Sequence, residues 1–440
     1  MTITVAIIGS GPAGFYTADA LVNAACDIQV DIIERLPTPY GLIRGGVAPD
    51  HQTTKRVAKK YERTALFDTV RYFGHVEVNK DVSLAELREM YDAVVLAVGA
   101  PVDRKLTIPG ADKKGVHGSA AFVGWYNGHP DFRDLEPDLG TDAAIVIGNG
   151  NVSLDVARVL VRTRDGMNQA NADIAAHAID LIEKSSLKDV WLVGRRGPVD
   201  AKFTNVELRE LGDLEQAVPL VKAEQLPDAV PDDAGLDERA RRLAERNLAT
   251  LHDYVANGPA DKPKHLRIEF YAQPVEILGD EHVSAVRFER TRVEGERAIG
   301  TGEFFEIPCG LVIGAIGYRS DPIAGAPYDE KRGIIPNDNG RVETGLYAVG
   351  WIKRGPSGVI SSNRPDGITV AEYICADFKD GGGRPGRAAL APLLQERGVR
   401  VVSFDDWKKI EAAEEARSRE EGVPREKFVS VPEMLKVLDG

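Results

Sequence analysis

The chain of 440 residues has few cysteines and no long apolar segment, and both absences exclude classes of protein. Its three cysteines, Cys26, Cys309 and Cys375, stand far apart, so the sequence has no CxxC pair and no iron–sulfur ligand set. We expect all three to be small buried side chains in a reducing compartment, the cytoplasm. No apolar run approaches the roughly 18 residues of a membrane-spanning helix, so no membrane partner is expected.

Positive charges are fewer than negative charges. Lysine and arginine number 55 against 68 aspartates and glutamates, which gives a net charge of −13. This balance disfavours nucleic acid as a general partner, although it leaves room for a local basic face. The length allows two or three domains with large cores.

A glycine-rich loop stands near the N-terminus, where GSGPAG at residues 9–14 follows an apolar run. In such a loop Gly9 makes the tight turn, Gly11 lets the main chain approach a pyrophosphate, and Gly14 lets the following helix pack close to the strand. A second apolar run ends at Glu34, whose carboxylate can accept hydrogen bonds from ribose hydroxyls. The pattern predicts a dinucleotide-binding βαβ unit.

A second loop of this kind lies in the middle of the chain. Residues 148–153 read GNGNVS, with Ser153 where a third glycine or alanine is usual. The later strand ends at Arg195 and Arg196 and not at an acid. Two adjacent guanidinium groups can clamp a 2′-phosphate, which favours NADP over NAD; the alternative is a solvated basic pair. Two loops imply two bound dinucleotides, as in a flavoenzyme that takes electrons from a nicotinamide.

Strands and helices alternate along the chain, which predicts an α/β fold with two dinucleotide-binding, Rossmann-like domains. Apolar runs that end in glycine recur at residues 93–99 and 311–317, and a similar run at residues 344–350 indicates that the chain returns to the first domain. The second domain is therefore expected to be inserted into the first. The first part of the first domain is expected at residues 1–103 and the inserted domain at residues 104–319. The second part of the first domain, with a C-terminal extension, is expected at residues 320–440.

Several motifs resemble those of adrenodoxin-reductase-type ferredoxin–NADP reductases, and the resemblance extends from residue 2 to near the C-terminus. They are PTPYGLIR, VAPDH, GNGNVSLD, RRGP and GWIKRGP, at residues 37–44, 47–51, 148–155, 195–198 and 350–356. The Gly-Trp pair in the last motif is specific, because general flavin reductases usually have Gly-Asp there. The sequence departs from the family at residues 45–46, Gln52 and Lys202, which bears on partner choice more than on cofactor choice.

The resemblance implies that the two-part domain binds FAD and the inserted domain binds NADP(H). Besides the glycines of the first loop, the implied FAD contacts are Ala13, Glu34, Leu42, Val82, Trp351, Gly358, Val359 and Ile360. The implied NADP contacts are Asn149, Gly150, Asn151 and Val152 at the pyrophosphate, Arg195, Arg196 and Glu207 at the adenosine end, and Gly358 at the nicotinamide. The resemblance also places His51 and Asp155 near the flavin and Glu210 beside the nicotinamide, either as a proton-handling set or as a structural hydrogen-bond network.

These features predict a ferredoxin–NADP(+) reductase, which accepts a hydride from NADPH and passes single electrons through FAD to a ferredoxin. An acidic ferredoxin is expected to dock on a helix at residues 236–254, through Arg242 and Arg246, and on Arg209 of the preceding helix. The alternative for that helix is a solvated face whose arginines pair with neighbouring acids. The alternative functions are reduction of another acceptor, or redox sensing by an NADPH-binding flavoprotein without steady turnover.

Overall fold

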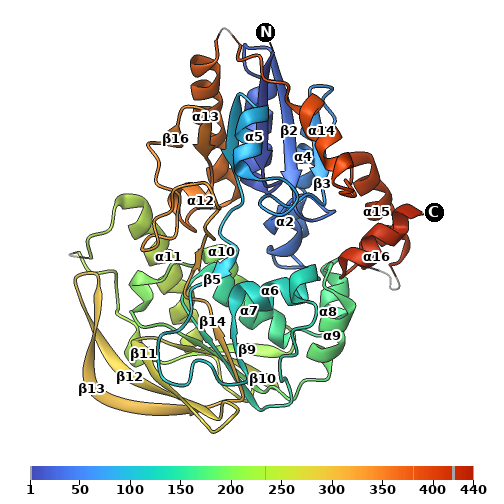
Figure 1. Cartoon of the computed structure of the whole chain (residues 1–440). Coiled ribbons are helices and arrows are strands. Elements are labelled where there is room, and N and C mark those ends of the chain that lie inside the picture. The colour runs from blue at the N-terminus through green and yellow to red at the C-terminus, as the bar shows by residue number, and fades with distance from the viewer. Residues whose placement is uncertain (1, 233, 380, 419–421, 440) are drawn as a thin grey trace. The chain divides into compact units, whose positions relative to one another are not determined.

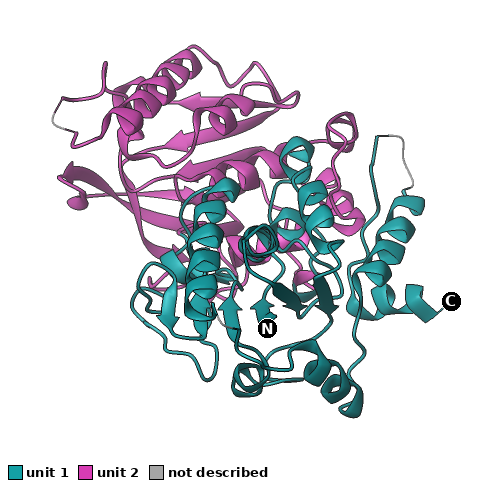
Figure 2. Ribbon diagram, turned by 90° about the horizontal axis from the view of Figure 1, so that it is seen from above, with its two compact units in different colours: residues 1–102, 127–131, 317–440 teal, residues 103–126, 132–316 magenta. Residues whose placement is uncertain are grey.

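The computed structural model describes residues 2–232, 234–379, 381–418 and 422–439, and the chain divides into two compact units (Figures 1 and 2). Unit 1 comprises residues 1–102, 127–131 and 317–440, and unit 2 comprises residues 103–126 and 132–316. The chain leaves unit 1 at β5 (Val102–Asp103) and returns just before β15 (Tyr318–Arg319), so the second unit is inserted into the first. No sequence pattern indicated that residues 127–131 belong to unit 1.

Unit 1 is built on a six-stranded sheet in the order β16-β17-β4-β1-β2-β3, in which only β16 pairs antiparallel among the described strands. The strands are β1 (Ile3–Ile8), β2 (Ile28–Glu34), β3 (Val70–Gly74), β4 (Ala93–Leu96), β16 (Arg341–Glu343) and β17 (Leu346–Ala348). Val5 and Ile7 of β1 face one hydrophobic core, whereas Ala6 and Ile8 face another. Because both faces are covered, this strand does not alternate, and its one polar residue, the buried Thr4, donates its hydroxyl to Asp92 at 3.1 Å.

Helices cover both faces of this sheet. One core includes α1 (Pro12–Val22), α4 (Ala58–Ala65), α13 (Asn363–Asp377) and α15 (Phe404–Ala416), and the other includes α5 (Leu84–Met90) and α14 (Arg387–Glu396). The shorter helices are α2 (Leu42–Gly45), α3 (Gln52–Lys55), α12 (Trp351–Arg354) and α16 (Val431–Lys436). Helix α13 packs closely on α1, since a Cβ on Gly367 would lie 2.8 Å from the main-chain nitrogen of Thr17.

Unit 2 contains a parallel sheet in the order β6-β14-β7-β8-β10-β9. Its strands are β6 (Val116–Gly118), β7 (Ala143–Ile147), β8 (Asp189–Val193), β9 (Ala217–Val221), β10 (Lys264–Glu269) and β14 (Leu311–Gly314). One face packs on α6 (Ser119–Tyr126), α7 (Asn151–Val161), α8 (Arg164–Gln169), α9 (Ala176–Glu183), α10 (Asn205–Glu210) and α11 (Glu238–Val255). An antiparallel sheet of β11 (Ala272–Leu278), β12 (Ala285–Glu294) and β13 (Arg297–Pro308) covers the other.

The predicted α/β fold, with one dinucleotide-type unit inserted into another, is confirmed. The amphipathic helix predicted at residues 236–254 is α11, which begins after Asp237, whose side chain caps it by accepting from the Ala240 nitrogen at 2.8 Å. No helix in the described part of the chain has both the length and the apolar composition that a bilayer crossing requires.

The cysteines correct the sequence analysis. Cys26, just after α1, and Cys375, on α13, form a disulfide with a Cα–Cα distance of 6.3 Å, and both residues are half-buried. Cys309 alone is an unbonded, buried thiol, as expected. The bonded pair is 349 residues apart in sequence, and the packing of α1 against α13 brings it together. The expectation of three unbonded small side chains is therefore wrong, because cysteine spacing carries no information about helix packing.

The disulfide predicts a thiol count. Protein unfolded without reductant should have one titratable thiol, Cys309, and prior reduction should raise the count to three. Replacing Cys26 and Cys375 by serine should lower the free energy of unfolding by about 2–4 kcal/mol, because the unfolded chain regains the entropy of an open loop. The Cys309→Ala variant is the control, with no thiol before reduction. Three thiols in untreated wild-type protein would show that the bond does not form.

Candidate functional site

The first glycine loop, residues 9–14, joins β1 to α1. Gly9 has a φ of +106°, and a Cβ on it would lie 2.6 Å from the main-chain oxygen of Ala97. A Cβ on Gly14 would lie 2.1 Å from the oxygen of Gly9, so the close approach of helix to strand requires glycine here. A Cβ on Gly11 would meet no described atom within 4 Å. The loop therefore fits a pyrophosphate, which would meet this open main chain and the amino terminus of α1.

Glu34 ends β2 beside this loop and organises it. One carboxylate oxygen accepts hydrogen bonds from the main-chain nitrogen (3.1 Å) and the hydroxyl (2.7 Å) of Ser10. The other oxygen accepts from the Leu36 nitrogen at 3.2 Å. A carboxylate has about four acceptor sites, so Glu34 retains capacity for ribose hydroxyls. The residue that the sequence analysis assigned to a ligand thus also holds the loop in shape.

A distant segment, residues 350–360, adjoins the first loop. Gly350 has a φ of +72°, and a Cβ on it would lie 2.6 Å from the Cβ of Ala13. The indole nitrogen of Trp351 donates to the main-chain oxygen of Ser357 at 3.1 Å, which closes the segment on itself. The bond closes residues 351–357 into a turn, and the predicted flavin residues Gly358, Val359 and Ile360 follow it directly in sequence.

Asp366, in the first turn of α13, anchors the same segment. Its carboxylate accepts from the main-chain nitrogen of Gly350 at 3.1 Å and pairs with Lys353 at 2.8 Å and with Arg354. Val359, in contrast, is 61% exposed, so this part of the segment offers surface to a ligand. Sequence reasoning missed Asp366, because an acid in the first turn of a helix is usually explained by the helix dipole alone.

Three further residues of unit 1 were predicted to lie near FAD. Leu42 begins α2 and is 44% exposed, and His51 is half-buried just before α3. Val82 is only 1% exposed and belongs to a core with Leu84 and Leu87. Protein atoms cover almost all of the surface of Val82, which leaves little of its side chain for a ligand. Its predicted contact with the adenine stays a prediction.

The second glycine loop, residues 148–153, joins β7 to α7 under similar constraints. Gly148 has a φ of +146°, and a Cβ on it would lie 2.3 Å from the main-chain oxygen of Ala315. The buried Ser153 hydroxyl donates to the Gly150 oxygen at 2.6 Å and lies 3.0 Å from the Gly150 nitrogen. A Cβ on Gly150 would meet no described atom within 4 Å. This loop too requires small residues where it packs against the sheet, and its main chain is uncovered at Gly150.

The residues predicted at the NADP pyrophosphate fasten this loop to unit 2. A Cβ on Gly194 would lie 1.7 Å from the Asn149 amide nitrogen, so this glycine makes room for that side chain. The Asn151 side chain accepts from the main-chain nitrogen of Thr204 at 2.8 Å, directly before α10. Val152 is half-buried against the helix core.

The arginine pair follows β8. Arg195 is exposed, whereas Arg196 is half-buried, 3.3 Å from the Asp200 carboxylate and 3.5 Å from the main-chain oxygen of Glu296. Glu207, the third residue predicted at the adenosine end, is half-buried in the first turn of α10. The arginines stand at the carboxyl end of a parallel strand, the edge where open α/β sheets bind ligands.

Tyr271 supports the loop that carries these arginines. A Cβ on Gly197 would lie 2.2 Å from the Tyr271 hydroxyl oxygen, so glycine allows the ring to pack against the loop. Burial, with the nearby Asp200 carboxylate, raises the pKa of Tyr271. The hydroxyl therefore stays neutral at physiological pH and adds no negative charge that would repel a phosphate.

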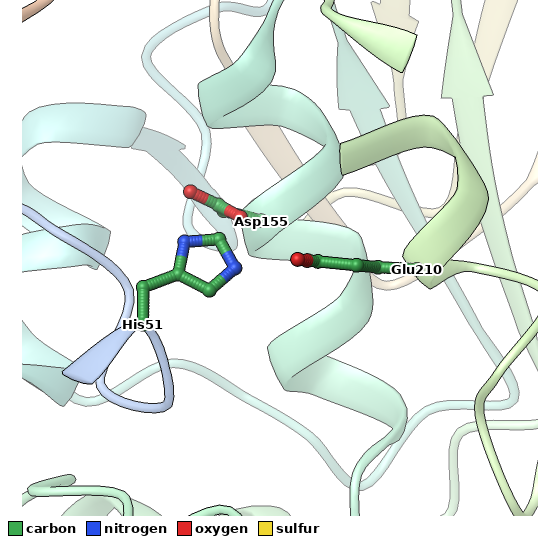
Figure 3. A group of neighbouring side chains, drawn as sticks. All are labelled: His51, Asp155 and Glu210. Atoms are coloured by element: carbon green, nitrogen blue, oxygen red, sulfur yellow. The ribbon is translucent and has the colours of Figure 1, made fainter. Parts of the chain in front are cut away.

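Asp155 on α7 and Glu210 on α10 form a carboxylate pair inside unit 2 (Figure 3), with oxygens within 4.8 Å of each other. Arg158, one turn further along α7 and only 1% exposed, lies 3.0 Å from the Asp155 oxygen and 3.4 Å from the Glu210 oxygen. This buried cation holds the two like charges together. Sequence reasoning missed it. The third predicted member of the set, His51, belongs to unit 1.

The predicted docking arginines lie on two packed helices of unit 2. Arg242 and Arg246 are exposed on α11, four residues apart, and Arg209 is exposed on α10. The Asn205 side chain of α10 donates to the Arg246 main-chain oxygen at 3.1 Å, which joins the helices. Arg242 also pairs with Glu238, as the alternative of a solvated, internally paired face requires.

Known proteins resemble this chain in both sequence and structure. The family model described as pyridine nucleotide-disulphide oxidoreductase matches residues 3–188. The chain is 43% identical to human mitochondrial NADPH:adrenodoxin oxidoreductase over 99% of its own length and 92% of that protein. It is 40% identical to the NADPH-ferredoxin reductase FprA of Mycobacterium leprae, over 99% of its length and 98% of the relative.

The solved structure of Mycobacterium tuberculosis FprA in complex with NADPH superposes with a TM-score of 0.95 at 37% identity, and each chain is covered completely. A likeness of this extent includes both units and the C-terminal helices, and not only a shared dinucleotide fold. The chain therefore belongs to the adrenodoxin-reductase-type ferredoxin–NADP reductases, as its motifs predicted.

Proposed function

We propose that the chain is a ferredoxin–NADP(+) reductase, a flavoenzyme that passes electrons from NADPH through FAD to a ferredoxin. The observation that carries the proposal is the difference between two similar glycine loops. The second strand of unit 1 ends in Glu34, whereas β8 of unit 2 is followed by Arg195 and Arg196. The first suits an unphosphorylated ribose and the second a 2′-phosphate. The relatives' names, which pair NADPH with adrenodoxin or ferredoxin, support this assignment.

Unit 1 would hold FAD. Residues 9–14 would bind its pyrophosphate, Glu34 a ribose, and Trp351 with residues 358–360 the isoalloxazine. The contact between Gly350 and the first loop supports this set, because it joins the two segments within one unit. When bound, FAD supplies two-electron chemistry toward a nicotinamide and one-electron chemistry toward an iron–sulfur carrier.

Unit 2 would hold NADPH. Residues 149–152 would cover the pyrophosphate, and Arg195, Arg196 and Glu207 would hold the adenosine end. Gly358 would meet the nicotinamide, which supplies a hydride when it is bound. The protein's contribution is orientation and electrostatics, and no nucleophile is required.

Proton balance gives the acidic pair a role. Oxidation of one NADPH by two one-electron carriers releases one proton, which must leave the site. We assign this task to His51, Asp155 and Glu210, since histidine titrates near neutrality and two carboxylates can share a proton. Arg158 would keep both carboxylates ionised until a proton arrives.

Direct tests are available. NADPH should bleach the flavin absorbance, and cytochrome c reduction should accelerate strongly when a ferredoxin is added. Bleaching without turnover on any acceptor would instead support the sensing alternative, and turnover that ignores every ferredoxin would support another acceptor. A cytoplasmic location stays a prediction, because the relatives include mitochondrial as well as mycobacterial proteins.

Cofactor selectivity tests the arginine pair. Replacing both Arg195 and Arg196 by alanine should raise the apparent KM for NADPH by two orders of magnitude or more and leave the KM for NADH nearly unchanged. Two charge-assisted contacts of about 1.5–3 kcal/mol each support that scale. Arg63→Ala, which removes an exposed arginine of α4 in unit 1, is the control. Equal weakening of both nucleotides would exclude a phosphate-reading role.

Arg158 gives a pH-dependent prediction. Arg158→Met leaves two neighbouring carboxylates without their cation, so the folded-state pKa of Asp155 or Glu210 should rise. An acid whose pKa is raised on folding stabilises the folded state less as pH increases. Urea unfolding should therefore show that the variant loses about 2–3 kcal/mol of its free energy of unfolding at pH 8 and less at pH 5. This loss is smaller than that for a fully buried ion pair, because both carboxylates keep some exposure. Arg158→Lys should lose less, and an equal loss at both pH values would contradict this account.

The docking arginines give a prediction about salt. A ferredoxin is typically acidic, and opposite charges steer encounter in a way that salt screens. Reversing Arg242 and Arg246 to glutamate should lower ferredoxin-dependent cytochrome c reduction and remove its dependence on ionic strength, while ferricyanide reduction stays near normal.

The matched control reverses Lys59 and Arg63, two exposed cations four residues apart in the α4 segment of unit 1. This variant should keep the ferredoxin rate and its salt dependence. Equal effects of both double reversals would mean that net charge, and not this face of unit 2, governs the encounter. Loss of ferricyanide reduction in the first variant would point to damaged folding or NADPH binding.

A further inference from the structure

Hydrogen bonds from the antiparallel sheet of unit 2 hold the arginine loop, residues 194–197. The main-chain oxygens of three consecutive residues, 194, 195 and 196, all accept hydrogen bonds. The main-chain nitrogens of Ala272 and Tyr271 donate to the first and third of these oxygens, at 3.0 and 3.3 Å. The middle oxygen, that of Arg195, accepts instead from the Thr291 hydroxyl at 2.7 Å. Only this middle bond depends on the identity of a side chain.

Thr291 is itself held firmly in β12. It is 7% exposed, and its main-chain nitrogen donates to the Tyr271 oxygen at 3.0 Å. The pairing of β12 with β13 shifts register between Glu289 and Thr291, and such a bulge redirects the side chains next to it. The bulge is therefore consistent with a threonine hydroxyl that is aimed out of the sheet at the arginine loop.

The turn of the same hairpin contacts the second arginine. The Glu296 main-chain oxygen lies between β12 and β13 and accepts from the Arg196 guanidinium at 3.5 Å. The Asp200 carboxylate lies 3.3 Å from that guanidinium. The hairpin thus contacts the loop both at the main chain of Arg195 and at the side chain of Arg196.

We propose that Thr291 is a positioning residue for cofactor selectivity, which aims Arg195 and Arg196 at the 2′-phosphate of NADPH. The inference rests on the function proposed above. The Arg195 carbonyl belongs to the peptide that joins the two arginines, so its orientation sets the directions in which their side chains leave the main chain. Without the hydroxyl, this carbonyl would have to turn to find another donor, since an unpaired polar group near the core is costly.

The test measures binding on the FAD-loaded protein by titration calorimetry, with 2′,5′-ADP and 5′-AMP as probes that differ in the 2′-phosphate. Thr291→Val keeps shape and β propensity but removes the donor. It should raise the Kd of 2′,5′-ADP about 3- to 10-fold, the effect of one hydrogen bond, and leave the Kd of 5′-AMP unchanged. The KM for NADPH should rise likewise while kcat stays constant. Thr291→Ser, which restores the hydroxyl, should return all values to those of wild type.

Thr301→Val is the matched control, because the Thr301 hydroxyl donates to the Arg290 main-chain oxygen at 3.0 Å on the same hairpin. It should change neither Kd. Thr291→Cys, with a weak thiol donor, replaces the valine variant if that variant does not fold. Wild-type binding of 2′,5′-ADP by Thr291→Val, or equal weakening of both probes, would overturn the inference. If wild-type protein bound 2′,5′-ADP and 5′-AMP equally well, the result would instead contradict the proposed NADPH site itself.

Discussion

In both glycine loops the following helix begins very close to the preceding strand, and this closeness requires small residues. In unit 1 the Gly9 oxygen lies where a side chain on residue 14 would have to be, 2.1 Å from an ideal Cβ. Glycine at that position lets α1 begin against β1, and its amino terminus then faces the outer side of the loop. In unit 2 the corresponding residue is Ser153, whose hydroxyl donates to the Gly150 oxygen within the loop at 2.6 Å.

Ion pairs near each loop fix the residues that were predicted to form the site. Asp366 ties Gly350 and two cations together, which fixes the segment predicted to lie along the flavin. Arg158 holds the carboxylates of Asp155 and Glu210 in one place despite their like charge. In both places a buried or half-buried ion pair joins segments that the sequence separates, and removal of one partner would leave the other charge uncompensated.

The two sheets differ in what covers them, and this difference bears on function. Helices cover both faces of the sheet in unit 1, whereas in unit 2 an antiparallel sheet covers one face. That sheet supplies Tyr271 next to β11 and Thr291 on β12, both of which bond to the loop with Arg195 and Arg196. The antiparallel sheet therefore does more than cover the hydrophobic core, because it also contacts the residues expected to select the cofactor.

The sequence by itself determined the α/β class, the insertion of one dinucleotide unit into another, and the family, because glycine loops and apolar strands are local patterns with a local physical cause. Glu34 and Arg195 could be proposed as ligand contacts for the same reason, since Glu34 ends its strand and Arg195 stands just after another. Only the tertiary structure decided which distant residues meet: Cys26 with Cys375, Asp366 with Gly350, and Arg158 with Glu210. Such contacts depend on how helices pack, and packing depends on the summed shape of many side chains, which no short stretch of sequence contains.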